Sequence, residues 1–164
     1  MSALAAHLRA FAARAPVEAD APFLARLYAS TRQDLLGTGS ADPALAASLI
    51  AMQQRLQAAD YRARFPDAEY LVLHQAGEPV ARIVVDHGRA ALRLVDIVLL
   101  PRARGRGTGR ALLGALQRFA ADHDLPLTLS VHHANPRARR LYLGLGFRIE
   151  RADTHADALR WQAA

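Results

Sequence analysis

The sequence predicts a mixed α/β fold with a largely antiparallel sheet, in a single domain that spans residues 1–164. The length of 164 residues and the composition, 52% hydrophobic and 22% charged, are those of a globular domain with a sizeable core. Helix-like apolar periodicity dominates the chain before residue 69, and short runs rich in Val, Ile and Leu dominate after it. The short turns between these runs favour antiparallel pairing.

Two helices are expected before residue 69. Asp20 is a candidate N-cap of the first, "DAPFLARLYASTR". Its apolar face is formed by Phe23, Leu24, Leu27 and Tyr28. Asp42 and Pro43 begin the second, "ADPALAASLIAMQQRLQAAD", after a loop at residues 37–40. Its helically spaced apolar residues are Leu45, Leu49, Met52 and Leu56.

Six strands and two further helices are expected after residue 69. The strands are "EYLVLHQ", "PVARIVVDH", "ALRLVDIVLL", "PLTLSVH", "GFRIERA" and "HADALRW". A helix between the third and fourth strands gives the one strand–helix–strand crossover. Its inward residues are Leu112, Leu113, Leu116, Phe119 and Ala120. The second helix, "NPRARRLYLGL", follows the fourth strand.

Composition excludes several classes of site. The chain has no cysteine, which rules out disulfides, thiolate catalysis and thiolate metal ligands. The seven histidines lack metal-binding spacing, so we predict no metal. No apolar run approaches the roughly 18 residues of a membrane span, and no membrane contact is expected. His7 and Arg9 interrupt the apolar opening segment, which favours a first element of the domain over a transit peptide, and hence a cytoplasmic location.

The charge pattern does not favour nucleic-acid binding. The net charge is +6, and all 21 basic residues are arginine. Positive charge alone would permit contact with phosphate backbones. The arginines are scattered, however, and only 6% of residues are aromatic, so stacking platforms are scarce. We therefore predict no nucleic-acid partner.

A glycine-rich loop, "RGRGTGR" at residues 104–110, lies between an apolar strand and a helix. This order is typical of a phosphate site, because glycine admits close approach and a helix start presents free amide groups. A dinucleotide fingerprint would need a third glycine where Arg110 stands. A nucleotide P-loop would end in Gly-Lys-Ser/Thr, and the sequence has no lysine.

The pattern Arg104-x-x-Gly107-x-Gly109 resembles the coenzyme A pyrophosphate loop of the GNAT superfamily of N-acetyltransferases. A second segment, "VHHANPRARRLYLGLGF" at residues 131–147, is similar to another motif of that family. The two stand in the family's order and at its usual separation. The resemblance is sharp over residues 92–150 and looser elsewhere. It implies a V-shaped opening between the strands "RLVDIVLL" and "LTLSVH", and acetyl-CoA as acyl donor.

The resemblance also implies which residues hold the coenzyme. The strand that would pair with the pantetheine amides contains Ile97, Val98 and Leu99. The phosphate loop would comprise Arg104, Gly105, Arg106, Gly107, Thr108, Gly109 and Arg110. Asn135, which the sequence alone explains as a helix cap before Pro136, would lie against the pantetheine arm or the substrate. Arg139, one turn later, would reach a coenzyme phosphate.

Two residues are candidates for catalysis. The family tyrosine at the position of Tyr142 lies near the thioester sulfur and can protonate the departing thiolate; its alternative is a core tyrosine. Asp96 is a carboxylate in an apolar strand, which is costly unless it is paired or faces a cleft. It could pair with an arginine or help to deprotonate or position an amine. The acceptor's proton could instead go to a histidine, such as His132 or His133, or to water.

The predicted reaction is acetyl transfer from acetyl-CoA to an amine by direct attack in a ternary complex. Without cysteine there is no thiol to carry an acyl intermediate. The acceptor is expected to be a small-molecule or peptide amine, bound by residues 28–65, including Tyr28, Arg32, Tyr61 and Arg64. A homodimer is compatible with the pattern. The alternative function is a non-catalytic module that binds coenzyme A as a sensor or interaction partner.

Overall fold

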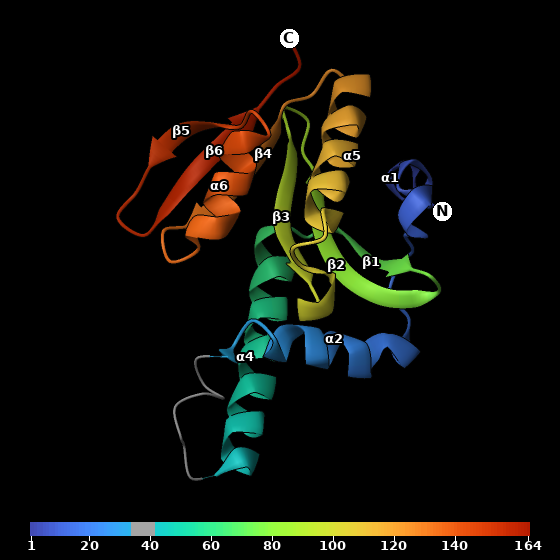
Figure 1. Ribbon diagram of the computed structural model, residues 1–164, viewed down its shortest axis with the longest axis vertical. Coiled ribbons are helices and arrows are strands. Elements are labelled where there is room, and N and C mark those ends of the chain that lie inside the picture. Colours follow the sequence, from blue (N-terminus) through green and yellow to red (C-terminus); the bar gives the residue numbers. More distant parts are fainter. Residues whose placement is uncertain (34–41) are drawn as a thin grey trace.

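The computed structural model describes residues 1–33 and 42–164, and it confirms the mixed α/β prediction (Figure 1). The loop predicted at residues 37–40 lies outside the described residues. The sheet has six strands in the order β1-β2-β3-β4-β6-β5. All neighbours pair antiparallel except β3 and β4, which are joined by the predicted strand–helix–strand crossover.

The predicted helices and strands occur in the predicted order. The α-helices are α1 (Ala3–His7), α2 (Ala21–Ala29), α4 (Pro43–Arg64), α5 (Thr108–Asp122) and α6 (Pro136–Gly144). The strands are β1 (Glu69–Gln75), β2 (Glu78–His87), β3 (Leu92–Leu99), β4 (Leu127–His132), β5 (Arg148–Ala152) and β6 (Ala156–Trp161). Short 3-10 helices are η1 (Arg9–Phe11), η2 (Glu18–Asp20) and η3 (Pro101–Ala103).

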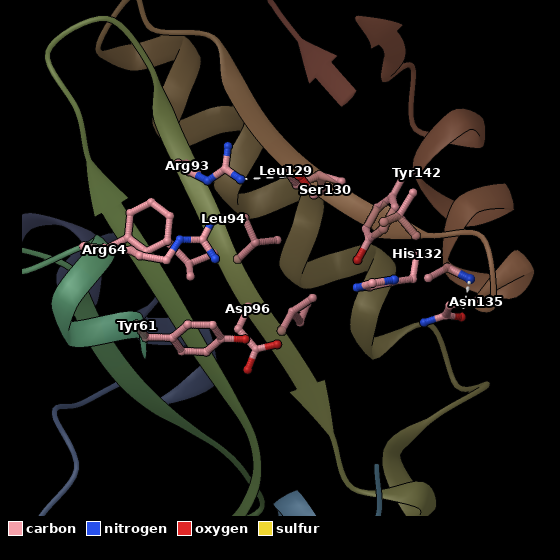
Figure 2. Close-up of a pocket in the computed structure, with 15 residues that line it drawn as sticks. Tyr61, Arg64, Arg93, Leu94, Asp96, Leu129, Ser130, His132, Asn135 and Tyr142 are labelled. Carbon is pink, nitrogen blue, oxygen red and sulfur yellow. Dashed lines mark hydrogen bonds between the residues drawn. The ribbon is translucent and has the colours of Figure 1, made fainter. Parts of the chain in front are cut away.

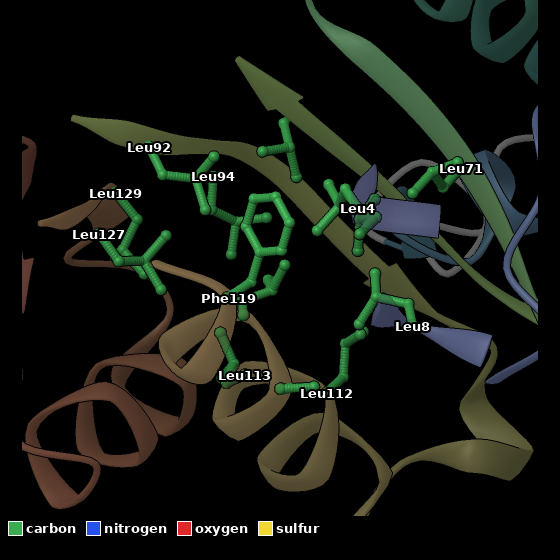
Figure 3. Close-up of a cluster of buried hydrophobic side chains, with 14 of the residues drawn as sticks. Leu4, Leu8, Leu71, Leu92, Leu94, Leu112, Leu113, Phe119, Leu127 and Leu129 are labelled. Carbon is green, nitrogen blue, oxygen red and sulfur yellow. The ribbon is translucent and has the colours of Figure 1, made fainter. Parts of the chain in front are cut away.

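The main core lies on the face of the sheet that α1, α5 and α6 cover. Because side chains alternate along a strand, Leu92 and Leu94 of β3 face this core together with Phe119 of α5 (Figure 3). A smaller cluster on the other face contains Phe23 and Leu27 of α2, with Val98 of β3 packed against it. Strand β3 therefore contributes side chains to both faces.

Strands β3 and β4 separate part of the way along their length. They pair in parallel at only three positions, from Leu92 opposite Leu127 to Leu94 opposite Leu129. Beyond that point β3 runs on to Leu99 and β4 to His132, but the two strands no longer pair with each other. The register between β2 and β3 also shifts at this level, and such a bulge bends the strand. The predicted V-shaped opening is therefore present.

Helix α4 begins as predicted but turns a different face inward. The Asp42 side chain accepts hydrogen bonds from the amides of Ala44 and Leu45, at 2.9 and 3.3 Å, and Pro43 opens the helix. The buried residues are Ala46 and Ile50. The predicted apolar stripe is exposed instead: Leu45, Leu49, Met52 and Leu56. Helical spacing identified the helix, but the inward stripe lies one residue further along the chain.

Asp20 precedes α2 but does not cap it with its side chain. Its carboxylate accepts two hydrogen bonds from Arg14, at 2.7 and 2.9 Å, and one from the Val17 amide at 2.7 Å. The hydrogen bonds from Arg14 and, to a lesser degree, from the Val17 amide lower the pKa of Asp20 to about 2. The prediction that Asp20 caps α2 is therefore wrong, because its carboxylate is hydrogen-bonded to Arg14 and to the Val17 amide instead.

The described residues contain neither a membrane-spanning helix nor a metal-binding cluster. No helix among them combines the length and apolar character that crossing a bilayer requires. Nor do His, Asp and Glu side chains gather there in a group of three that would bind a metal ion.

Candidate functional site

A cavity of about 470 Å³ occupies the opening between β3 and β4 (Figure 2). Side chains from β3, β4, α6 and the end of α4 surround it. Its lining comprises Tyr61, Arg64, Phe65, Arg93, Leu94, Val95, Asp96, Ile97, Leu129, Ser130, Val131, His132, Asn135, Ala138 and Tyr142. The separation of the two strands thus exposes polar side chains inside an otherwise continuous sheet.

A second cavity, of about 380 Å³, lies between β3 and the helices α2 and α4. Tyr28, Thr31 and Gln57 line it from the helical side. The two cavities share Tyr61, Asp96, Ile97, His132 and Asn135. Two molecules approaching through different cavities would therefore meet at this shared wall.

Tyr142 of α6 lies at the edge of the first cavity, and its hydroxyl points toward the opening (Figure 2). Its ring packs edge-on against Phe147, with 5.9 Å between ring centroids, and the residue is 7% exposed. Burial, and to a lesser degree the charge of Asp96, raise the pKa of Tyr142 to about 12. The two predicted catalytic residues therefore face the same space, and the phenol stays protonated.

Asp96 pairs with Arg82 on the neighbouring strand β2. Both side chains are largely buried, at 18% and 14% exposure. The contact joins one guanidinium nitrogen to one carboxylate oxygen, and the Arg82 Nε is buried without a hydrogen-bond partner among the described residues. Tyr61 points its hydroxyl toward Asp96 (Figure 2), and burial followed by that charge raises the pKa of Tyr61 to about 12.

The glycine loop follows β3 and leads into α5. Gly105 and Gly107 have φ values of 71° and 82°, in the left-handed region that favours glycine. A Cβ at Gly107 would meet nothing within 4 Å, so the backbone there borders open space. No side chain caps the start of helix α5. The first hydrogen bond of the helix runs from the Ala111 amide to the Gly107 carbonyl. The amides of Thr108, Gly109 and Arg110 precede it and lack partners within the helix.

Arg104 is turned back toward the strand rather than over the loop. Its Nε donates to the Leu99 carbonyl at 2.8 Å, and its NH2 to Ser30 Oγ at 3.1 Å. The Leu99 carbonyl, predicted to pair with pantetheine, is therefore already bonded to Arg104. Arg137 lies over the loop, since its NH2 would stand 3.1 Å from a Cβ at Gly105.

Asn135 caps α6 as predicted, accepting the Ala138 amide at 3.2 Å, and it lines both cavities. Arg139 does not point to the loop. Its Nε donates to the buried Asp157 of β6 at 2.8 Å, and His133 Nε2 lies 2.9 Å from the other carboxylate oxygen. These contacts lower the pKa of Asp157, that with Arg139 most. They hold α6 and the residue that follows β4 against strand β6.

Some of the remaining predicted residues line the cavities, and others do not. Ile97 lines both cavities, and Val98 lines the second. Thr108 is buried and accepts a hydrogen bond from Gln75 at 3.2 Å, whereas Arg106 and Arg110 are exposed. Of the residues predicted for the acceptor side, Tyr28, Tyr61 and Arg64 line a cavity, and Arg32 is not among the lining residues.

Sequence reasoning missed Arg93, which lines the first cavity from β3. The signal was available, since Arg93 and Asp96 are the two charged residues in the apolar run "LRLVDIVLL". Only Asp96 was considered. Phe65, at the end of α4, was missed as well, and nothing in the sequence indicated that its ring would lie beside Arg93.

Three of the solved structures that share this fold are described as acetyltransferases. PaiA N-acetyltransferase from Thermoplasma acidophilum, solved with coenzyme A, has a TM-score of 0.67 at 16% identity, with 92% of this chain and 98% of that one covered. An acetyltransferase from Thermus thermophilus gives 0.62 at 24% identity, covering 92% and 97%. A GNAT acetyltransferase from Elizabethkingia anophelis with acetyl-CoA bound gives 0.56 at 13%, covering 63% and 82%.

At these identities the structures establish the fold alone. The model of the acetyltransferase (GNAT) family matches residues 24–147, which include the strand opening, the glycine loop and Tyr142. The match takes in well over half of the chain, and it confirms the resemblance drawn from the two sequence motifs. The chain belongs to the GNAT family of acetyltransferases.

Proposed function

We propose that this protein transfers the acetyl group of acetyl-CoA to an amine, by direct attack of the amine within a ternary complex. The observation that carries the proposal is the opening between β3 and β4. It combines a buried, protonated tyrosine, a carboxylate and two cavities that meet at one wall. The glycine loop at the end of β3 adds a phosphate site next to it. Two of the solved structures with this fold contain coenzyme A or acetyl-CoA.

The loop fits the pyrophosphate of the coenzyme. The open space beside Gly107 would admit a phosphate, and the free amides at the start of α5 would donate to it. Arg137, Arg106 and Arg110 would supply positive charge. Arg104 would act indirectly, by holding the loop against Leu99 and Ser30. The pantetheine arm would then run along the unpaired edge of β3, at Ile97 and Val98, toward Asn135.

Tyr142 would assist departure of the thiolate. Attack by the nitrogen gives a tetrahedral intermediate. When it collapses and the carbon–sulfur bond breaks, negative charge develops on sulfur, and the phenol can donate a hydrogen bond or a proton to it. A pKa of about 12 makes Tyr142 a weaker acid than free tyrosine. The same burial also disfavours a free thiolate, which keeps the two groups closer in proton affinity.

Asp96 would bind the acceptor as an ammonium and help it to lose its proton. An alkylammonium has a pKa of about 10.4 and arrives protonated at neutral pH. One oxygen of Asp96 contacts Arg82, and the shared wall of the two cavities is where the carboxylate would meet the amine. The ammonium would first lose one proton to Asp96, to His132 or to water in the cavity, which frees the nitrogen lone pair for attack. After attack the nitrogen would lose a second proton, by the same routes, before the tetrahedral intermediate collapses.

Coenzyme binding is tested with a matched pair of glycine variants. At 100 times the dissociation constant, coenzyme A should stabilise the wild type by about 2.7 kcal/mol, a melting shift of roughly 5–10 °C. Gly107→Val should abolish the shift. Gly77→Val is the control, because Gly77 has a similar φ of 80° and equally open space but lies in the β1–β2 turn. A normal shift in Gly107→Val would place the phosphates elsewhere.

Acetyl transfer is tested by thiol release from acetyl-CoA across a panel of amines, amino acids and peptides. The proposal predicts release that depends on the acceptor and yields the acetylated amine in equal amount. Tight coenzyme binding without transfer to any acceptor would instead favour a coenzyme A sensor.

A further inference from the structure

Among the residues of β3 that line the first cavity, Arg93 lies farthest from the strand end that leads into the glycine loop. It stands six residues before Leu99 on β3, so about 20 Å of extended strand separate it from the strand end that leads into the loop. If the coenzyme phosphates bind at the loop, its thioester reaches Asp96 and Tyr142 in the middle of the strand opening. A group bound at Arg93 would therefore belong to the acceptor.

The guanidinium of Arg93 has unused hydrogen-bonding capacity. Its Nε is buried and lacks a hydrogen-bond partner among the described residues, and its NH2 donates only a long bond, 3.3 Å, to Ser130 Oγ. No carboxylate of the described chain makes an ion pair with it. Asp86, opposite Arg93 on β2, is the one acid whose charge supports it, without direct contact.

A second guanidinium lies beside the first. The guanidinium carbons (Cζ) of Arg64 and Arg93 lie 5.3 and 5.5 Å from the centroid of the Phe65 ring. Figure 2 shows both side chains on the same side of the cavity as Asp96 and Tyr61, across from Tyr142. Arg64 makes a 3.3 Å ion pair with Asp60 that is exposed on both sides, which leaves it available to a ligand.

The surroundings disfavour this concentration of positive charge. Burial lowers the pKa of Arg93, and the nearby charges of Arg64 and Arg151 lower it further, against the opposing effect of Asp86. An anion between the two guanidinium groups would remove the repulsion and supply the missing partner for Nε. Arginine suits this role because its planar fork matches the geometry of carboxylate and phosphate.

We propose that Arg93 and Arg64 bind an oxyanion of the acceptor, so that the acceptor is an amine carrying a carboxylate or phosphate at the other end of a short chain. The inference rests on the proposed function and deepens it. Asp96 would hold the ammonium end near Tyr142, and the arginines would hold the anionic end. The two charged residues are three positions apart on β3, about 10 Å of strand, which favours several bonds between amine and oxyanion.

The test measures binding of matched probes to the coenzyme A complex by calorimetry. The probes are δ-aminovalerate, its neutral primary amide, and phosphoethanolamine. Charge-assisted bonds of this kind should give at least one anionic probe about tenfold tighter binding than the amide. Arg93→Gln should erase that preference and Arg64→Gln should weaken it. Arg118→Gln, which removes an exposed arginine from α5 on the opposite face of the sheet, should leave it unchanged.

Carboxylate binding and phosphate binding are separated by which anionic probe wins. Equal affinity of all three probes for the wild type would overturn the inference, and so would a preference that survives in both Arg93→Gln and Arg64→Gln. Acetyl transfer to the same probes is followed in parallel. A binding preference without acetyl transfer to these probes or to any amine of the panel would contradict the proposed function alone, whereas transfer without an anionic preference would contradict this inference alone.

Discussion

Two arginine–aspartate pairs in this protein are built differently. Asp20 is 6% exposed and accepts three hydrogen bonds, two from Arg14 and one from the Val17 amide. Among the described residues, Asp96 makes one hydrogen-bonded ion pair, with Arg82, and the buried Nε of Arg82 has no hydrogen-bond partner there. Asp96 lines both cavities, and Asp20 lines neither.

The difference separates a structural pair from a candidate functional one. A buried charge whose hydrogen bonds are complete stabilises the fold locally and has nothing left to offer a ligand. A buried carboxylate with one contact, facing a cavity, retains acceptor capacity that a substrate can use. Removing each charge in turn should therefore affect different properties of the protein.

The largest effect is expected from Asp96→Asn. The variant keeps the shape of the side chain but loses the charge that would bind the ammonium and take up its proton, so kcat/KM for the amine should fall about 100-fold. Steady-state kinetics with the best acceptor of the amine panel measure it. The control is Arg82→Gln, which removes the other partner and leaves the carboxylate. If both variants lose activity equally, the pair serves the fold and Asp96 has no separate role.

Asp20→Asn should instead reduce stability. The variant leaves Arg14 without its counter-ion and places amide hydrogens where the Val17 amide also donates, at a cost of about 2 kcal/mol. Urea unfolding at neutral pH gives the free energy. The acetylation rate of the folded variant should stay within twofold of wild type. A loss of activity comparable to that of Asp96→Asn would break the distinction between the two pairs.

A smaller effect should appear in acid. The native pKa of Asp20, about 2, lies below its unfolded value, so its stabilisation is present above about pH 4 and is lost as the pH falls toward 2. Because the Arg14 side chain is 43% exposed, screening reduces the contribution to about 1 kcal/mol. Urea titrations at several acidic pH values should show this loss in wild type beyond that in Asp20→Asn. If the free energy of unfolding falls equally with pH in wild type and Asp20→Asn, the Arg14–Asp20 pair contributes nothing to stability.

Local sequence signals predicted much of this architecture. Turns and apolar runs identified all six strands, and the glycines at 105 and 107 adopt the positive φ that a tight loop requires. The inward residues of α5 followed from helical periodicity, and Leu112, Leu113, Leu116, Phe119 and Ala120 are all buried. These features could be predicted because each depends on residues close together in the sequence.

The pairing of charged side chains and the docking of helices could not be predicted in this way. The bonds from Arg14 to Asp20 and from Arg139 to Asp157 depend on which of 21 arginines comes near each carboxylate. The inward face of α4 depends on its docking, since Leu45 and Leu49 fit the pattern as well as Ala46 and Ile50 do. The arginine pair beside Phe65 likewise forms only where the end of α4 reaches β3.

The most direct test of the account compares the wild type with Tyr142→Phe. The ring and its packing against Phe147 are kept, so coenzyme A affinity should change less than twofold and the melting temperature should change little. Only the hydroxyl that would donate to the leaving sulfur is lost, and the acetyl-transfer rate at saturating acetyl-CoA should fall about 100-fold, within the usual range for acid catalysis. A fall of less than threefold, with coenzyme binding intact, would show that Tyr142 is a core residue and would contradict the account.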